Sequence, residues 1–135
     1  MHYHIGSQIE KSGDILTPIK YALDVYFKLK KTNPSLDTLD IGGGMPIPYT
    51  SDRGFNIDKL MEKIFTLLKT EAEKHEMPHP NLICEWGRYV VAPAQMTIFK
   101  VIDTKKVHKT KKDDKKWYVI DGSFMNDLCD TWSVD

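Results

Sequence analysis

Three short motifs carry the residues whose types could do chemistry in this chain of 135 residues. They are His4-Ile5-Gly6-Ser7, Gly42-Gly43-Gly44 and Glu85-Trp86-Gly87-Arg88. A serine hydroxyl, an arginine guanidinium and open glycine amides are donors that can hold one phosphate group. The carboxylate of Glu85 closes an apolar segment, where it is costly unless a cationic or protonated group lies beside it. The motifs together predict a phosphate site next to a carboxylate.

The glycine triplet follows an expected strand and precedes an expected helix, so its backbone amides can form a nest for an anion. Its spacing fits neither the G-x-G-x-x-G fingerprint of dinucleotide sites nor the P-loop pattern of nucleoside triphosphate sites. The nucleotide-binding hypotheses therefore lose their main support. The simpler alternative is that three glycines form only a flexible turn.

Simpler structural roles also exist for the charged and imidazole side chains. Glu85 could form an ion pair with Arg88, three residues further on. His2 and His4 share one face of an extended segment, which suggests a metal site. Cys84 and Glu85 are adjacent on a strand and point apart, so they leave no third ligand, and we predict no metal ion. The flat imidazole of His4 could instead stack on a planar cofactor.

Strand and helix patterns alternate along the first part of the chain. Strands are expected at residues 2–5, 36–41 and 81–84, and helices from Thr17 to Asn33 and at residues 56–75. Thr17 would cap the first helix with Pro18 at its first position, and Asn33-Pro34 would end it. This order predicts an α/β fold with parallel crossovers, whose strands bring their carboxyl ends to one edge. The three motifs should therefore converge.

The pattern changes after Glu85. Residues 89–107 and 117–120 have strand-type composition with no helix between them, so an antiparallel region is expected to begin near residue 93. Two and a half βα units cannot close an eight-stranded barrel, which needs roughly 200 residues. We therefore interpret residues 1–92 as part of a (β/α)8 TIM barrel and residues 93–135 as the start of a β domain. Such a piece of a larger fold would expose apolar edges and tend to associate.

Composition excludes several classes of partner. Nineteen Lys and Arg balance nineteen Asp and Glu, so no global field favours nucleic acid or an anionic membrane. Residues 105–116 carry seven lysines and two aspartates, and we interpret them as a solvated hairpin tip because no aromatic residue interleaves the lysines. No apolar stretch reaches the ~20 residues of a bilayer span, and no signal peptide is present. We expect a soluble, cytoplasmic protein whose Cys84 and Cys129 are reduced thiols.

The three motifs, with Asp40 before the glycines and Pro46 after them, resemble those of the pyridoxal-phosphate-dependent decarboxylases that act on ornithine, diaminopimelate and arginine. Those enzymes pair an alanine-racemase-like (β/α)8 barrel with a C-terminal β domain. The resemblance implies that His4 stacks on the pyridine ring and Glu85 pairs with the ring nitrogen, both as catalytic residues. The glycines and the hydrogen-bond donors Ser7 and Arg88 of the three motifs would bind the phosphate of the cofactor. The full set of implied cofactor-binding residues is His4, Gly6, Ser7, Gly42, Gly43, Gly44, Glu85, Gly87 and Arg88.

The resemblance also implies a substrate class. Pro78-His79-Pro80 and Asp130-Thr131-Trp132 are similar to biosynthetic arginine decarboxylases, which convert arginine to agmatine and carbon dioxide for polyamine synthesis. The segments 47–50 and 125–128 are more similar to the diaminopimelate enzymes. Arginine is thus the first expectation, with diaminopimelate or ornithine as the alternative.

Two departures from the family limit what this chain could do alone. The family's Schiff-base lysine lies upstream of the His-x-Gly-Ser motif, and no lysine here matches it. The family's catalytic cysteine lies further along the β domain, so Cys129-Asp130 is not assigned that role. We expect the chain alone to be inactive, and the parent enzyme to form a homo-oligomer whose sites are completed by both chains. An alternative class is a non-catalytic cofactor-binding or scaffold protein that lacks the lysine.

Overall fold

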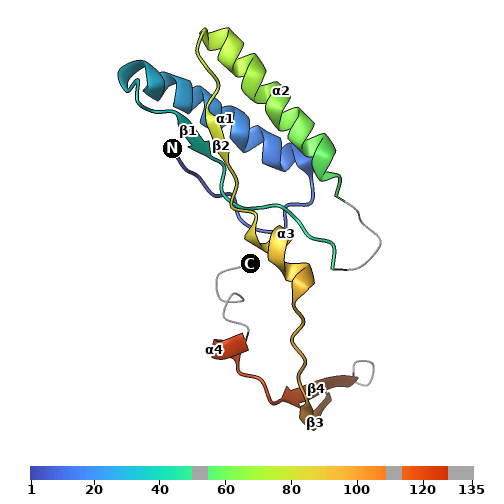
Figure 1. The fold of residues 1–135 in the computed structure, drawn as a ribbon. Coiled ribbons are helices and arrows are strands. Elements are labelled where there is room, and N and C mark those ends of the chain that lie inside the picture. Colours follow the sequence, from blue (N-terminus) through green and yellow to red (C-terminus); the bar gives the residue numbers. More distant parts are fainter. Residues whose placement is uncertain (50–54, 109–113, 128–135) are drawn as a thin grey trace. The chain divides into compact units, whose positions relative to one another are not determined.

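The computed structural model describes residues 1–49, 55–108 and 114–127, and the chain divides into two compact units, Met1–Ala94 and Gln95–Asp135 (Figure 1). Several residues discussed above lie outside the described ranges: Thr50, the hairpin tip at residues 109–113, Leu128, Cys129, Asp130, Thr131 and Trp132.

The first unit alternates helices and strands. Its elements are α1 (Ser12–Thr32), β1 (Thr38–Asp40), α2 (Ile57–His75), β2 (Asn81–Ile83), α3 (Gly87–Val91) and a 3-10 turn (Ala92–Ala94). β1 and β2 pair in parallel, with Leu39 opposite Leu82. His2 adds a parallel bridge to Asp40 on the other side of β1. The predicted α/β fold with parallel crossovers is confirmed.

The expected strand at residues 2–5 is wrong, because only a single bridge forms there. The Tyr3 amide donates to the Asp40 carbonyl at 3.2 Å, and the Asp40 amide donates to the Met1 carbonyl at 2.8 Å. β1 then ends at Asp40, and the chain turns at Gly42, which has a φ of 65°. The N-terminal segment therefore has no ladder partner beyond Asp40, so its pairing stops after one bridge.

Helix α2 follows its predicted bounds, whereas α1 begins earlier than predicted. Asn56 caps α2 by accepting a hydrogen bond from the Lys59 amide at 2.9 Å. α1 starts at Ser12 and not at Thr17, so Pro18 lies inside the helix. Ile15, one turn before Ile19, is buried, and its burial favours the longer helix. That gain opposes the cost of the one backbone hydrogen bond that Pro18 cannot donate.

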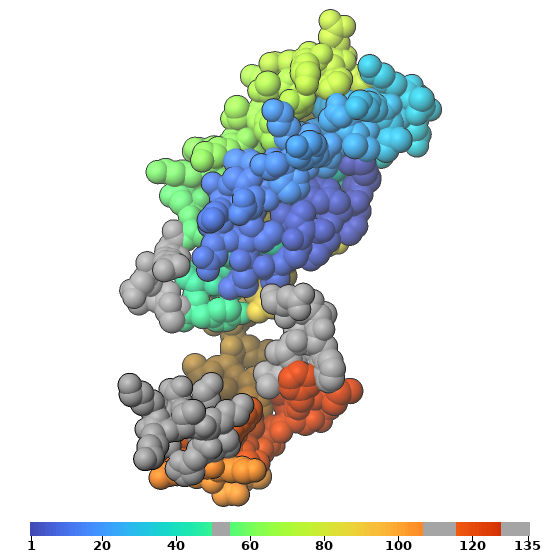
Figure 2. Space-filling model, turned by 180° about the vertical axis from the view of Figure 1, so that it is seen from behind, coloured from blue at the N-terminus to red at the C-terminus, as the bar shows by residue number. Residues whose placement is uncertain are grey.

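The core lies where α1 and α2 pack together and against the strands. Figure 2 shows α1, in blue, and α2, in green, against each other on one face of the first unit. The largest fully buried side chains all belong to these helices and to β1: Ile19, Leu23, Tyr26, Phe27, Leu39, Leu60 and Ile64. The two helices and β1 form one apolar core cluster in the first unit. The polar groups of the three motifs lie outside this core, at the ends of the strands.

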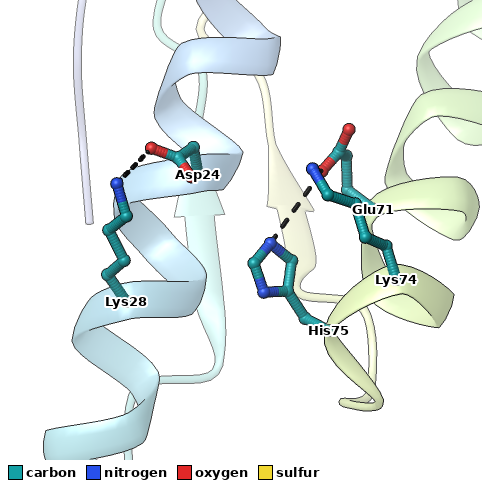
Figure 3. A network of polar contacts seen from close by, with 5 residues as sticks. All are labelled: Asp24, Lys28, Glu71, Lys74 and His75. Atoms are coloured by element: carbon teal, nitrogen blue, oxygen red, sulfur yellow. Dashed lines mark hydrogen bonds and ion pairs between the residues drawn. The ribbon is translucent and has the colours of Figure 1, made fainter.

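A polar network closes the core at the end of α2 (Figure 3). The His75 ring stacks on Phe27, with ring centroids 4.7 Å apart and an interplanar angle of 17°. Buried Glu71 pairs with Lys74 at 3.1 Å and lies 3.9 Å from His75 Nε2. The network therefore gives the buried carboxylate of Glu71 a cationic neighbour, Lys74, at the helix end that contacts α1.

Truncating Leu23 is expected to lower the free energy of unfolding by about 2–5 kcal/mol, because Leu23→Ala leaves a cavity between α1 and its neighbours. The matched control is Tyr21→Ala on the same helix, since the Tyr21 side chain is 72% exposed. It should change stability by less than about 0.5 kcal/mol. Urea unfolding followed by circular dichroism measures both, and equal losses would contradict this account of the core.

The second unit is a hairpin and a short helix. β3 (Val101–His108) and β4 (Asp114–Ile120) pair antiparallel, with Lys105 opposite Trp117, and α4 (Phe124–Asp127) follows. Lys105, Lys106 and Lys116 are exposed. Among the described helices, none is long and apolar enough to cross a bilayer.

The strand-type composition that begins at residue 89 predicts strand, and this prediction is wrong for residues 89–94. That segment forms the second half of α3 and the 3-10 turn, and the Val90 amide donates to the Trp86 carbonyl at 3.1 Å. Valine favours strands because its side chain packs well on a pleated, half-buried surface. Val90 and Val91 are exposed and gain little from such packing, so local hydrogen bonds determine the structure of this segment.

Candidate functional site

The ends of the strands bring the three motifs together, as the sequence predicts. The Glu85 amide donates to the Gly42 carbonyl at 2.9 Å, which extends the pairing of β1 and β2 beyond their last residues. The Gly43 amide donates to His4 Nδ1 at 3.1 Å. The glycine loop therefore lies between the segment that carries His4 and the segment that carries Glu85.

Two glycines are required by this close approach. A Cβ on Gly43 would lie 2.8 Å from His4 Cε1 and 3.4 Å from the Glu85 carbonyl oxygen. A Cβ on Gly42 would clash with the Tyr3 carbonyl oxygen, and Gly42 has a φ of 65°. A side chain at either position would push the motifs apart, so the loop is more than a flexible turn.

The amides of the glycine loop differ from the expected anion nest. The Gly42 amide donates to Asp40 Oδ1 at 2.9 Å, and the Gly43 amide donates to His4 Nδ1. Two of the three amides therefore bind side chains of the protein. Side chains that accept from a backbone amide compete with any anion for it, and this competition is not visible in the spacing of glycines.

The hydrogen bond from Gly43 determines the tautomer of His4. A backbone amide can only donate, so His4 Nδ1 must accept and the ring proton must be on Nε2. His4 is exposed, so one face of its ring is accessible. The residue therefore presents an imidazole ring whose orientation is set by the glycine loop.

Arg88 joins the first motif to the third. Its Nε donates to Ser7 Oγ at 3.1 Å, and its Nη1 donates to the Tyr49 hydroxyl at 2.8 Å. Gly6, beside Ser7, has a φ of 112°, which side chains rarely adopt. The pair of a hydroxyl and a guanidinium is a donor set suited to a phosphate group. The sequence did not indicate Tyr49 as part of the site, because its contact with Arg88 depends on the path of the loop after β1.

The position of Glu85 in the sequence suggests an ion pair with Arg88, but the structure places His2 beside its carboxylate. His2 Nε2 lies 3.4 Å from Glu85 Oε2, and the Glu85 side chain is 50% exposed. The argument from burial is therefore wrong for Glu85, because β1 is the only strand that pairs with β2 among the described residues. Among the described residues, His2, Asp40 and Glu85 bring ligand-type atoms within 4.8 Å of one another. The sequence did not indicate Asp40 as a partner for His2. The predicted absence of a metal ion stays a prediction.

Cys84 and Tyr3 lie beside this cluster as neutral groups. Burial, and then the charge of Asp40, raise the pKa of the Cys84 thiol to about 11. Burial, followed by the influence of Cys84, raises the pKa of the Tyr3 hydroxyl. Both groups are protonated near neutral pH, so they add no charge beside Glu85.

The raised pKa makes Cys84 a slow nucleophile. At pH 8 such a thiol holds about 100-fold less thiolate than an unburied one, and only the thiolate is alkylated. We expect iodoacetamide to modify Cys84 at least about tenfold more slowly in the native protein than in urea, with a rate that still rises between pH 9 and pH 10. Mass spectrometry of the Cys84 peptide measures the rate. A native rate that levels off near pH 8 would contradict the prediction.

A histidine, a glycine loop, an acidic residue and an arginine–serine pair gather at the carboxyl ends of two parallel strands, which is where α/β proteins bind their ligands. The comparison with protein families specifies the class. The chain belongs to the pyridoxal-dependent decarboxylases, and residues 1–92 match the pyridoxal-binding domain of that family.

Similar proteins agree with the family. The chain is 31% identical to the biosynthetic arginine decarboxylase of Phocaeicola vulgatus over 84% of its own length and 19% of the relative. It is 32% identical to that of Bacteroides thetaiotaomicron over 77% of its length and 18% of the relative. The chain thus spans about a fifth of the length of these curated relatives.

Solved structures show the same fold. The diaminopimelate decarboxylase of M. jannaschii superposes with a TM-score of 0.68 at 30% identity, over 91% of this chain and 27% of that one. The biosynthetic arginine decarboxylase of Campylobacter jejuni superposes with a TM-score of 0.64 at 22% identity, over 82% of this chain and 20% of that one. The fold expected from the sequence, part of a TIM barrel, agrees with these neighbours.

Proposed function

We propose that this chain forms one side of the pyridoxal phosphate site of an amino-acid decarboxylase whose preferred substrate is arginine. The convergence of His4, Gly43 and Glu85 at the carboxyl ends of parallel strands carries the proposal. Residues 1–92 would belong to the barrel and residues 93–135 to the start of the β domain. The whole enzyme would be cytoplasmic and a dimer or higher homo-oligomer.

The residues fit this cofactor on two observations. The loop of Gly42 and Gly43 lies so close to the first segment that a Cβ would fill the gap. The guanidinium and hydroxyl of Arg88 and Ser7 already contact each other, and together they can donate to a phosphate dianion. We assign the phosphate to Ser7, Arg88, the backbone of Gly6 and Gly87, and the loop of Gly42–Gly44, in which a phosphate would compete with Asp40 and His4 for the amides of Gly42 and Gly43.

Pyridoxal phosphate supplies a protonated pyridine ring that accepts the electron pair left when carbon dioxide departs from the substrate. Glu85 holds the proton on the ring nitrogen, because an ionised carboxylate favours the protonated form of a neighbouring base. His4 would stack on the ring, since the hydrogen bond from Gly43 sets the orientation of its imidazole. Arg88 and Ser7 would neutralise and hold the phosphate of the cofactor.

Arginine is favoured because the curated relatives with 31% and 32% identity are biosynthetic arginine decarboxylases. Diaminopimelate is the second candidate, because the M. jannaschii diaminopimelate decarboxylase has 30% identity over most of the chain. The lysine that the family uses to hold the cofactor covalently would come from a part of the enzyme outside these 135 residues.

The test uses the protein expressed with every residue that its gene encodes. Titration with pyridoxal phosphate should give saturable binding followed by absorbance, and carbon dioxide should be released from arginine faster than from diaminopimelate, ornithine or lysine. A preference for diaminopimelate would move the substrate to the second candidate. Cofactor binding without release of carbon dioxide from any of these amino acids would support the non-catalytic alternative, and a lack of cofactor binding would reject the proposal.

A further inference from the structure

The side chains of His2, Asp40 and Glu85 form a cluster at the edge of the proposed cofactor site. Their ligand-type atoms all lie within 4.8 Å of one another, and His2 Nε2 lies 3.4 Å from Glu85 Oε2. The backbone positions all three, because His2 forms a parallel bridge with Asp40 and the Glu85 amide donates to the Gly42 carbonyl. The cluster is thus held by the same strand ends that hold the glycine loop.

Asp40 is a fixed negative charge in this cluster. Its Oδ1 accepts the Gly42 amide at 2.9 Å, so the carboxylate cannot rotate away without losing a hydrogen bond of the glycine loop. Its charge contributes to raising the pKa of the neighbouring Cys84 thiol. The carboxylates of Asp40 and Glu85 repel each other at this distance unless a cationic group lies beside them.

A protonated Glu85 could not support a protonated ring nitrogen, so the repulsion by Asp40 has to be balanced. Cys84 and Tyr3 are neutral and cannot balance it. Arg88 donates to Ser7 and Tyr49. Within this cluster, His2 is the group that can carry a positive charge between the two acids.

We propose that His2 is a positioning residue for Glu85: its imidazole ring contacts the Glu85 carboxylate beside Asp40 and holds that carboxylate in one orientation toward the cofactor ring. This inference rests on the proposed function, because Glu85 acts on the ring nitrogen only if pyridoxal phosphate binds here. His2 itself does not touch the reacting atoms and acts through Glu85.

The test compares His2→Gln, Asp40→Asn and the double variant in the protein expressed with every residue of its gene. Glutamine keeps a hydrogen-bond donor but no positive charge, and asparagine keeps the oxygen that accepts from Gly42. His2→Gln should lower kcat about tenfold with little change in KM, because a Glu85 carboxylate that is no longer held toward the ring supports its protonation less well. Adding Asp40→Asn should restore kcat to within about threefold of the wild type, because the repulsion that His2 balances is removed.

A second readout needs no cofactor. In the cofactor-free protein, the ¹⁵N signals of the His2 imidazole should move in Glu85→Gln and in Asp40→Asn, whereas Glu73→Gln on the surface of α2 should leave them unchanged. All measurements are made in the presence of EDTA and repeated without it.

Each outcome decides the proposal. An unchanged kcat in His2→Gln, or a double variant that is worse than either single one, overturns the positioning role. An effect of His2→Gln that disappears with EDTA also overturns it and identifies the cluster as a metal site. If the wild type binds no pyridoxal phosphate, the proposed function fails, and the imidazole signals then show separately whether His2 couples to the two acids.

Discussion

Replacing Glu85 with glutamine is expected to lower kcat for decarboxylation by about 100-fold or more in the protein expressed with every residue of its gene. Glutamine has nearly the same shape but no charge, so it cannot hold a proton on the ring nitrogen, and the ring becomes a weaker acceptor of electrons. The dissociation constant for pyridoxal phosphate should change by less than about threefold, because Ser7 and Arg88 still hold the phosphate. Steady-state release of carbon dioxide and cofactor titration measure the two quantities.

The matched control for Glu85→Gln removes one carboxylate far from the strand ends. Glu73 lies on α2, where its exposed side chain pairs with Lys69 at 3.9 Å, and Glu73→Gln should leave kcat within about twofold. An unchanged kcat in Glu85→Gln with cofactor bound would remove Glu85 from the chemistry. A loss of cofactor binding equal to the loss of kcat would instead make Glu85 a binding residue only.

The sequence predicts the arrangement of the strand ends because parallel crossovers leave few choices. Once strands near residues 39 and 82 are joined through a helix, their carboxyl ends must share one edge. The apolar face of α2 and its Asn56 cap also follow local rules that involve only nearby residues. The convergence of the three motifs was therefore predictable without coordinates.

The side-chain partners at the site were not predictable in the same way. The Asp40 side chain could accept a hydrogen bond from an amide of its own loop or from a neighbouring strand. It accepts from its own loop because the chain turns at Gly42. The contact of His2 with Glu85, which are more than 80 residues apart in the chain, depends on the single bridge that His2 forms with Asp40. The start of α1 was missed because burial of Ile15 opposes the local cost of Pro18.

Replacing Gly43 with alanine is expected to weaken binding of pyridoxal phosphate by about 10- to 100-fold while the protein stays folded. The added Cβ would lie 2.8 Å from His4 Cε1, so the imidazole has to move away from the position in which it accepts from the Gly43 amide. The carbonyl of Glu85, 3.4 Å from the same Cβ, restricts movement in the other direction. A displaced ring cannot stack on the cofactor, and a misplacement of about 1 Å can cost 100-fold in rate. Absorbance titration gives the affinity, and circular dichroism reports the fold.

Two other glycines separate this effect from a general effect of adding a methyl group. Gly13 lies in α1 with nothing within 4 Å of an added Cβ, so Gly13→Ala should leave cofactor affinity unchanged and favour the helix by up to about 1 kcal/mol. Gly42→Ala should instead unfold the edge of the sheet, because its Cβ clashes with the Tyr3 carbonyl oxygen and its φ is 65°. If Gly43→Ala binds the cofactor as the wild type does, the His4 ring is not part of the binding surface. If it melts as Gly42→Ala does, the glycine serves the fold alone.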